Sequence, residues 1–222
     1  MSTSLRIAVL ASGRGSNLAA LIAARDRGEL PVEFVLVASD KAHADALRLA
    51  EAAGIATLAL DPRSYPSRRD FDLDLFARIA ASGAELLVLA GFMRILDAQA
   101  LRPWVGRIIN IHPSLLPKYP GLHTHRRALE AGDTEHGASV HYVTAELDGG
   151  PVIARTVLAI EPGDDEDRLA ARLLPREHRL LPAVVGLIAA GRLQLRDGDV
   201  QLDGRRLPAP LQWDCASEQL VG

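Results

Sequence analysis

Short apolar runs alternate with helical patterns along the first half of the chain. Five runs predict buried strands, at residues 6–11, 33–38, 56–60, 85–90 and 107–112. Between them, apolar residues recur at helical spacing and predict helices at 16–27, 42–53 and 68–82. Strands that are apolar throughout and separated by helices are typical of a parallel sheet covered on both faces. The first half therefore predicts a Rossmann-like α/β fold, with functional loops at the carboxyl ends of the strands.

The second half shows longer strands and a long helix. Residues 139–144 and 152–160 predict two strands around the turn 148–151, and residues 193–195 and 200–202 predict a hairpin around Asp197-Gly198. Residues 164–190 predict a helical stretch that is bent or broken near Pro175 and Pro182. After about residue 206 no element is indicated and a loose tail is expected. The fold class is thus a mostly parallel twisted sheet with antiparallel strands in its C-terminal part.

Composition limits the function without naming one. The 222 residues are 48% hydrophobic and 24% charged, which suits a packed core and not a disordered chain. A formal net charge of −3 argues against a nucleic-acid module, whose surface is basic. The single cysteine, Cys215, excludes an internal disulfide and fits a reducing cytoplasm. No signal peptide or membrane-spanning run is present, so a cytoplasmic location is expected.

The segment 12–18 (SGRGSNL) lies between the first predicted strand and the first predicted helix. Glycines let backbone amides approach an anion closely, and a helix N-terminus favours negative charge. Ser16 and Asn17 are able either to cap the helix or to donate hydrogen bonds to a phosphate. The segment is equally compatible with a phosphate site and with a tight turn before a capped helix.

A dinucleotide site is a second interpretation of the same segment. Gly13 and Gly15 begin the dinucleotide fingerprint, and Asp40 ends the second strand, where a ribose-binding acid is expected. However, Leu18 occupies the position of the third glycine, where close helix–strand packing requires a small residue. The sequence therefore disfavours NAD.

Polar residues gather around the end of the fifth predicted strand. Five of the seven histidines lie between residues 112 and 141, but no His-Glu-x-x-His motif accompanies them, so a metal site is disfavoured. Alternation along a strand places Asn110 and His112 on the same side of the sheet. An amide beside an imidazole suits stabilisation of an oxyanion, and a carboxylate would favour the charged imidazole. Asp148 is a candidate for that carboxylate, although it also suits a simple turn.

Several motifs together resemble the folate-dependent formyltransferases. They are 12–18 (SGRGSNL), 90–96 (AGFMRIL), 110–117 (NIHPSLLP), 121–125 (GLHTH) and 146–151 (ELDGGP). With the first motif included, the chain is similar to the branch that formylates glycinamide ribonucleotide in purine synthesis. The resemblance runs from about residue 6 to 208. It implies one catalytic domain (1–208), with a nucleotide-binding half (about 1–105) and a folate and catalytic half (about 106–208), followed by a tail (209–222).

The resemblance also implies a reaction. A formyl group moves from 10-formyltetrahydrofolate, a co-substrate, to the glycinamide amine of 5′-phosphoribosylglycinamide, giving the N-formyl product and tetrahydrofolate. The family's catalytic residues fall on Asn110, His112 and Asp148. Asn110 and protonated His112 then stabilise the oxyanion, while Asp148 holds the imidazolium and relays protons through water. No metal, NAD or covalent intermediate is expected.

The resemblance also implies which residues of this sequence contact the two ligands. The phosphoribosyl substrate is expected to contact Gly15, Ser16, Asn17 and Glu177, the last of which is otherwise an exposed helical acid. Folate is expected to contact Arg68, Met93, Arg94, Ile95, Leu96, Asn110, Thr144, Ala145, Glu146, Leu147 and Asp148. Because Arg69 is the next residue, the alignment that assigns the folate contact to Arg68 stays open. His123, His125 and His141 are expected to shape the site. The partners are two small molecules, without nucleic acid or membrane, and the protein is a monomer or homodimer.

Three alternatives remain at this stage. A formyltetrahydrofolate hydrolase normally carries an N-terminal regulatory domain, whereas the catalytic pattern begins here at Arg6. A methionyl-tRNA formyltransferase normally adds a C-terminal nucleic-acid-binding domain, and nothing after Arg192 has the length or charge for one. A non-catalytic nucleotide-binding module is disfavoured because Asn110, His112 and Asp148 occur together.

Overall fold

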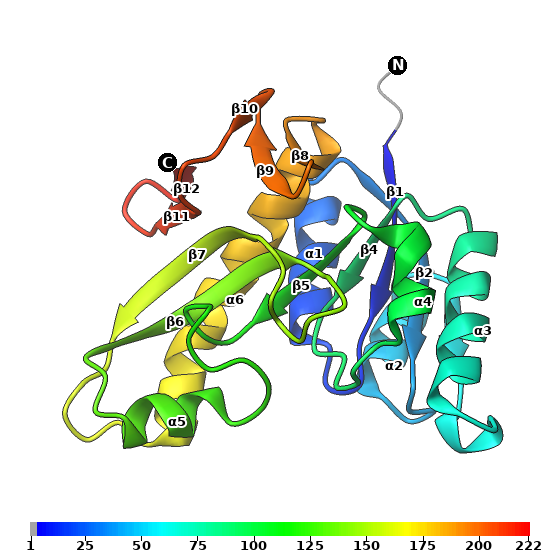
Figure 1. The fold of residues 1–222 in the computed structure, drawn as a ribbon, viewed down its shortest axis with the longest axis horizontal. Helices are drawn as coiled ribbons and strands as arrows, with labels where there is room; N and C mark the ends of the chain where they lie inside the picture. Colours follow the sequence, from blue (N-terminus) through cyan, green and yellow to red (C-terminus); the bar gives the residue numbers. More distant parts are fainter. Residues whose placement is uncertain (1–3) are drawn as a thin grey trace. The chain divides into compact units, whose positions relative to one another are not determined.

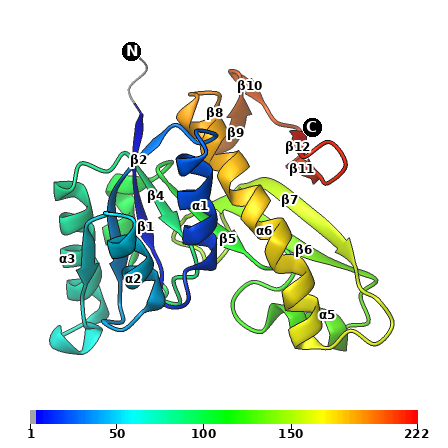
Figure 2. The ribbon, with the colours of Figure 1, turned by 180° about the vertical axis from the view of Figure 1, so that it is seen from behind.

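The computed structural model describes residues 4–222 of the chain. The chain divides into two compact units, residues 1–110 and 111–222. Figure 1 and Figure 2 show the ribbon from opposite sides. Within the described residues, no helix is both long enough and apolar enough to span a bilayer.

The first unit contains five parallel strands in the order β3-β2-β1-β4-β5. Their bounds are Leu5–Leu10 (β1), Val32–Ser39 (β2), Thr57–Ala59 (β3), Leu86–Leu89 (β4) and Ile108–His112 (β5, whose last two residues fall in the second unit). The helices are α1 (Ser16–Asp26), α2 (Asp45–Ala52), α3 (Arg68–Ala81) and α4 (Ala98–Leu101), with 3₁₀ turns at Pro62–Ser64 and Arg102–Trp104.

Helices cover both faces of this sheet, as the continuous apolar strands predict. Figures 1 and 2 show α1 and α2 on one face, with α3 and α4 on the other. Side chains of β1 that point to opposite faces, such as Val9 and Leu10, are both fully buried. Leu18 of α1 packs into the core from one side, and Phe71 and Leu75 of α3 pack from the other. The predicted parallel α/β architecture is confirmed.

The second unit combines antiparallel strands with a long helix. β6 (Glu135–Tyr142) pairs antiparallel with β7 (Val152–Ala159), β7 pairs parallel with β11 (Leu211–Asp214), and β11 pairs antiparallel with β12 (Gln219–Val221). A separate small sheet has the order β10-β9-β8, from Arg205–Arg206, Asp199–Leu202 and Leu193–Arg196. Helices α5 (Thr124–Glu130) and α6 (Glu166–Ala189) complete the unit. The predicted hairpin is confirmed as β8 and β9, with Asp197 and Gly198 both at positive φ, as such a turn requires.

The long helix and the C-terminal residues of the second unit differ in part from what the sequence predicts. The helix is not broken, since α6 runs as a single 24-residue helix through Pro175 and Pro182. Its fully buried apolar residues, including Leu173 and Leu180, outweigh the backbone hydrogen bonds lost at the prolines. The residues after 206 are not a loose tail, because β11 extends the sheet beside β7 and buries Leu211. The sequence pattern missed β11 because its partner lies about fifty residues away in the chain.

Candidate active site

The carboxyl ends of β1 and β4 bring two loops of the first unit together. Because these strands are parallel neighbours, the segment after β1 meets the segment after β4. The backbone N–H of Ser12 donates to the carbonyl of Gly91 (3.0 Å), and the Ser12 hydroxyl accepts from the N–H of Met93 (3.0 Å). The predicted phosphate loop (12–18) and the predicted folate loop (90–96) are therefore joined through Ser12.

The phosphate loop turns sharply at Gly15 to begin α1. Gly15 has φ +74°, and a Cβ there would lie 2.8 Å from the backbone Cα of Ala46, so any side chain is strained and crowded. Ser16 and Asn17 are the first residues of α1, and no side chain caps this helix end. This geometry is compatible with both interpretations of the segment, a phosphate site and a tight turn before the helix. The first turn of α1 has no acidic residue that would repel an anion.

The folate loop presents apolar side chains and a fixed arginine. Met93 is 66% exposed and Ile95 is also exposed, whereas Leu96 is buried in the unit. The guanidinium of Arg94 lies over the ring of Phe71 at 4.9 Å, which favours one position for the charge. Arg68 is exposed at the first helical residue of α3.

His112 ends β5 and is held by two oxygen atoms of the second unit. Only 6% of His112 is exposed. Its Nε2 lies 2.9 Å from the carbonyl oxygen of Tyr119, and its Nδ1 lies 3.5 Å from Oδ2 of Asp148. A carbonyl only accepts hydrogen bonds, so Nε2 carries a proton in this arrangement. The Asp148 carboxylate faces the other ring nitrogen, Nδ1. Asn110, half-buried, precedes His112 by two residues on β5.

The loop bearing Tyr119 is itself fixed by side chains. The Tyr119 hydroxyl donates to Asp133 at 2.8 Å, and Lys118 contacts the same carboxylate at 2.9 Å. Ser139 of β6 donates to the carbonyl of Ser114 at 2.7 Å. Sequence reasoning missed Tyr119, because a contribution through a backbone carbonyl leaves no mark in the residue type.

Asp148 is placed by the turn after β6. Its φ is +50°, and its Oδ2 accepts from the N–H of Gly121 at 2.8 Å. Gly150 cannot carry a side chain, because a Cβ would lie 1.8 Å from the carbonyl oxygen of Tyr142. The glycines therefore let the turn close tightly enough to aim the carboxylate at His112. The structure brings together His112 and Asp148, as predicted from their motifs.

A second imidazole, that of His141, faces the other oxygen of Asp148. His141 Nε2 lies 3.7 Å from Oδ1 of Asp148, while its Nδ1 donates to the carbonyl of Tyr142 at 2.9 Å. Burial lowers the pKa of His141 despite that hydrogen bond and the nearby carboxylate. The side chain of His141 is therefore neutral near pH 7.

The remaining predicted contacts of the second unit lie on one loop and one helix. Residues 144–147 form the bend before Asp148, closed by a hydrogen bond from the N–H of Gly149 to the carbonyl of Glu146 (3.2 Å), with Leu147 exposed. Glu177 of α6 is buried. The interpretation of Glu177 as an exposed helical acid is therefore wrong. A buried glutamate is unusual in a helix.

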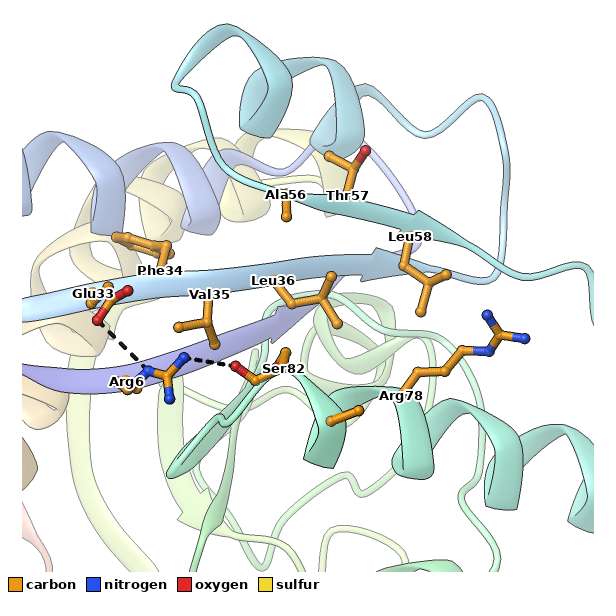
Figure 3. A pocket seen from close by; sticks show the side chains of 11 residues that line it. Arg6, Glu33, Phe34, Val35, Leu36, Ala56, Thr57, Leu58, Arg78 and Ser82 are labelled. Carbon is orange, nitrogen blue, oxygen red and sulfur yellow. Dashed lines mark hydrogen bonds and ion pairs between the residues drawn. The ribbon is translucent and has the colours of Figure 1, made fainter.

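Figure 3 shows a separate groove on the first unit. It has a volume of about 590 Å³ and is lined by residues of β2, β3 and the end of α3, among them Leu36, Leu58 and Arg78. Arg6 crosses it, paired with Glu33 at 3.7 Å and donating to the carbonyl of Ser82. None of the predicted site residues lines this groove. Within residues 4–222, no three His, Cys, Asp or Glu side chains are grouped closely enough to hold a metal ion.

The fold and the site define an α/β protein with a buried His–Asp pair at the end of a central strand, and sequence comparison gives the family. A model of the formyl transferase family matches residues 5–185, so the chain belongs to that family. It is 48% identical to phosphoribosylglycinamide formyltransferase of Escherichia coli K12 over 204 residues, covering 92% of this chain and 96% of that protein. It is also 47% identical over 191 residues to the trifunctional purine biosynthetic protein adenosine-3 of Drosophila pseudoobscura, covering 85% of this chain but 14% of that protein.

Solved structures of relatives agree with this assignment. Phosphoribosylglycinamide formyltransferase of Coxiella burnetii superposes with a TM-score of 0.88 at 48% identity, covering 91% of this chain and 95% of that one. Glycinamide ribonucleotide transformylase 1 of Symbiobacterium toebii gives a TM-score of 0.88 at 42% identity with the same coverage of both chains. The predicted fold and family are therefore confirmed.

Proposed function

We propose that this chain transfers the formyl group of 10-formyltetrahydrofolate to the glycinamide amine of 5′-phosphoribosylglycinamide. The products are 5′-phosphoribosyl-N-formylglycinamide and tetrahydrofolate, and the reaction belongs to purine biosynthesis. The buried His112–Asp148 pair carries the proposal, since it places an imidazole N–H donor and a carboxylate side by side at the end of β5. The high identity to relatives that bear the name of this enzyme supports the choice of substrates.

The first chemical step is attack on the formyl carbon. The neutral glycinamide nitrogen forms the new C–N bond, and the formyl oxygen becomes an oxyanion. The amide of Asn110 donates one hydrogen bond to this oxygen, and the imidazolium of His112 adds a charge-assisted interaction. To donate to substrate through Nε2, His112 exchanges the Tyr119 carbonyl for the oxyanion. Both groups act where charge develops, so they lower the barrier more than they strengthen substrate binding.

The second step is departure of the folate nitrogen. The oxyanion reforms the carbonyl, the bond between the formyl carbon and folate N10 breaks, and the amine proton moves to N10. Asp148 supports this transfer by holding His112 in its charged form and by accepting a proton from water. Its distance to His112 Nδ1 (3.5 Å) is suited to an electrostatic role. No covalent enzyme intermediate is needed.

Binding of the two substrates divides between loops. Gly15, Ser16 and Asn17 hold the phosphate at the start of α1, and buried Glu177 contacts the ribonucleotide. The pteridine of folate contacts Met93, Ile95 and Leu96 and their backbone groups, with Arg68, Arg94, Asn110 and residues 144–148 as further contacts. Exposed Met93 and Ile95 are apolar side chains that a folate ring system would cover.

We further propose a cytoplasmic enzyme that works as a monomer or homodimer without metal or NAD. The decisive experiment incubates the purified chain with 10-formyltetrahydrofolate, with and without 5′-phosphoribosylglycinamide. Formation of the N-formyl product only with the acceptor present supports the proposal. Deformylation that does not depend on the acceptor would identify a hydrolase, and formylation of methionyl-tRNA in a parallel reaction would identify the tRNA enzyme.

A further inference from the structure

The folate loop is fixed at both ends by buried side chains. At its start, Ser12 holds Gly91 and Met93. At its end, Oδ2 of Asp72 accepts a hydrogen bond from the backbone N–H of Asp97 at 2.7 Å. The side chain of Asp97 accepts in turn from the N–H of Gln99 and so begins α4. Residues 94–96 lie between these two hydrogen-bonded ends of the loop.

Asp72 is an unusual residue for its place in α3. It is 0% exposed, while aspartate is almost never fully buried without a partner. It does not cap the helix, because Ser67 does so through the N–H of Asp70. Its Oδ1 is also buried and has no hydrogen-bond partner within residues 4–222. Packing alone would favour an apolar residue here, so the carboxylate needs another explanation.

The charges that act on Asp72 include those of the two arginines expected to contact folate. Burial raises the pKa of Asp72, as does the nearby Asp97 carboxylate, while the Asp97 N–H and the positive charges of Arg94 and Arg68 act in the opposite direction. Arg94 lies over Phe71, the residue before Asp72, and its Nε is buried without a partner within residues 4–222. The ring of Phe71, next to Asp72 in α3, therefore holds the Arg94 guanidinium beside the stretch of helix that carries the buried carboxylate.

We propose that Asp72 is a positioning residue for the formyl donor, one that holds the end of the folate loop through the Asp97 amide and draws Arg94 into place by charge. The proposal rests on the proposed function, because it assigns the loop 91–97 to folate. Asp72 does not touch the reacting atoms. Its loss therefore weakens binding of 10-formyltetrahydrofolate and leaves the chemical step and the other substrate unaffected.

Two variants separate the hydrogen bond from the charge. Asp72→Asn keeps an oxygen that accepts from the Asp97 N–H but removes the charge facing Arg94. Asp72→Ala removes both. A hydrogen bond to a charged group contributes enough for its loss to weaken binding about 10- to 100-fold, so we expect Asp72→Ala to raise the folate KM by that factor. We expect a smaller rise for Asp72→Asn, with kcat and the KM for 5′-phosphoribosylglycinamide changed by less than about twofold in both.

The matched control is Asp74→Asn on the same helix. Asp74 is partly exposed, and its carboxylate is engaged by Tyr65 and Arg78. This variant is expected to keep the wild-type folate KM. Thermal melting of all variants, together with calorimetric titration of tetrahydrofolate, distinguishes lost folate affinity from lost stability.

Two results would overturn the inference. One is a wild-type folate KM in folded Asp72→Asn and Asp72→Ala; the other is a fall in kcat with both KM values unchanged. If Asp72→Ala does not fold, the nearly isosteric Asp72→Asn decides by the same measurements. A wild-type protein that fails to formylate 5′-phosphoribosylglycinamide would instead defeat the proposed function, which keeps the two failures distinct.

Discussion

At the residue scale, two oxygens decide what His112 is able to do. The Tyr119 carbonyl fixes which nitrogen bears the proton, and the Asp148 carboxylate faces the other nitrogen. An imidazole placed in this way presents an N–H donor at the end of β5. This polarity matches a reaction in which negative charge develops on an oxygen.

The His112–Asp148 pair can be tested by two substitutions. His112→Ala removes the charged donor, and Asp148→Asn removes the charge that sustains it. Each is expected to lower kcat by about 10²–10³, because both changes act on charge that develops in the transition state. Steady-state kinetics and calorimetric titration of both ligands are the measurements. Weaker ligand binding with near-normal turnover at saturation would contradict the assigned roles.

Gly15 gives a second test at this scale. Gly15→Ala combines a positive φ with a Cβ only 2.8 Å from the Ala46 backbone, so the phosphate loop must move. Strain of this kind costs about 1–3 kcal/mol, and we expect the KM for 5′-phosphoribosylglycinamide to rise about 5- to 100-fold. The folate KM should change much less.

Gly13→Ala is the control for that experiment. No atom lies within 4 Å of a Cβ built on Gly13, so alanine fits without moving the loop. Its effect on the same KM should be well below that of Gly15→Ala. Equal effects from the two variants would show that the loop responds to any added methyl group and not to the geometry at Gly15.

The sequence predicted some site residues and not others for physical reasons. Asn110, His112 and Asp148 stand in long motifs whose residue types point to the proposed chemistry. Tyr119 contributes only a backbone carbonyl, which any residue has. Asp72 lies in a helix rich in charged residues, where an aspartate suggests solvent exposure, and only the structure shows it buried beneath a loop.

At the element scale, local sequence patterns predicted the strands of the first unit well, whereas elements that depend on distant contacts were missed. Continuous apolar runs located β1, β2, β4 and β5 to within one or two residues, because burial on both faces demands such runs. Short β11 depends on pairing with distant β7, which no local pattern reveals. Helix α6 continues through Pro175 and Pro182 because the packing of its buried side chains outweighs the low helix propensity of proline.

The prolines of α6 suggest a stabilising substitution. Pro175 is exposed and lies in the helix interior, where it removes a hydrogen bond to the carbonyl of Ala171. Pro175→Ala restores this donor, and the gain exceeds the added entropy of the unfolded chain. We expect the free energy of unfolding to rise by about 1–2 kcal/mol, with Tm higher by roughly 2–8 °C in a thermal melt. A lower Tm would mean that Pro175 is needed for the path of the helix.

At the scale of the whole molecule, buried neutral histidines link stability to pH. Burial lowers the pKa of His125, His141 and His178, and it lowers that of His136 to about 4. His136 and His125 also share a single hydrogen bond, Nε2 to Nδ1 at 2.9 Å, between β6 and α5. Protonating both rings would place two donors against each other, so the pair is stable only when at most one ring is charged.

This coupling predicts the pH range over which the protein loses stability. An unfolded histidine has a pKa of about 6.5 and folded His136 about 4, so between these values the unfolded chain binds a proton that the folded protein excludes. By linkage, the contribution of His136 is complete above pH 6.5 and is lost as the pH falls toward 4, by about 2 kcal/mol after allowance for solvent screening. Urea unfolding at pH 7.5 and pH 5.0 should show a smaller difference in His136→Gln than in wild type. Exposed His43→Gln, the control, should match wild type, and an equal pH dependence in all three proteins would rule out His136 as a source of the acid sensitivity.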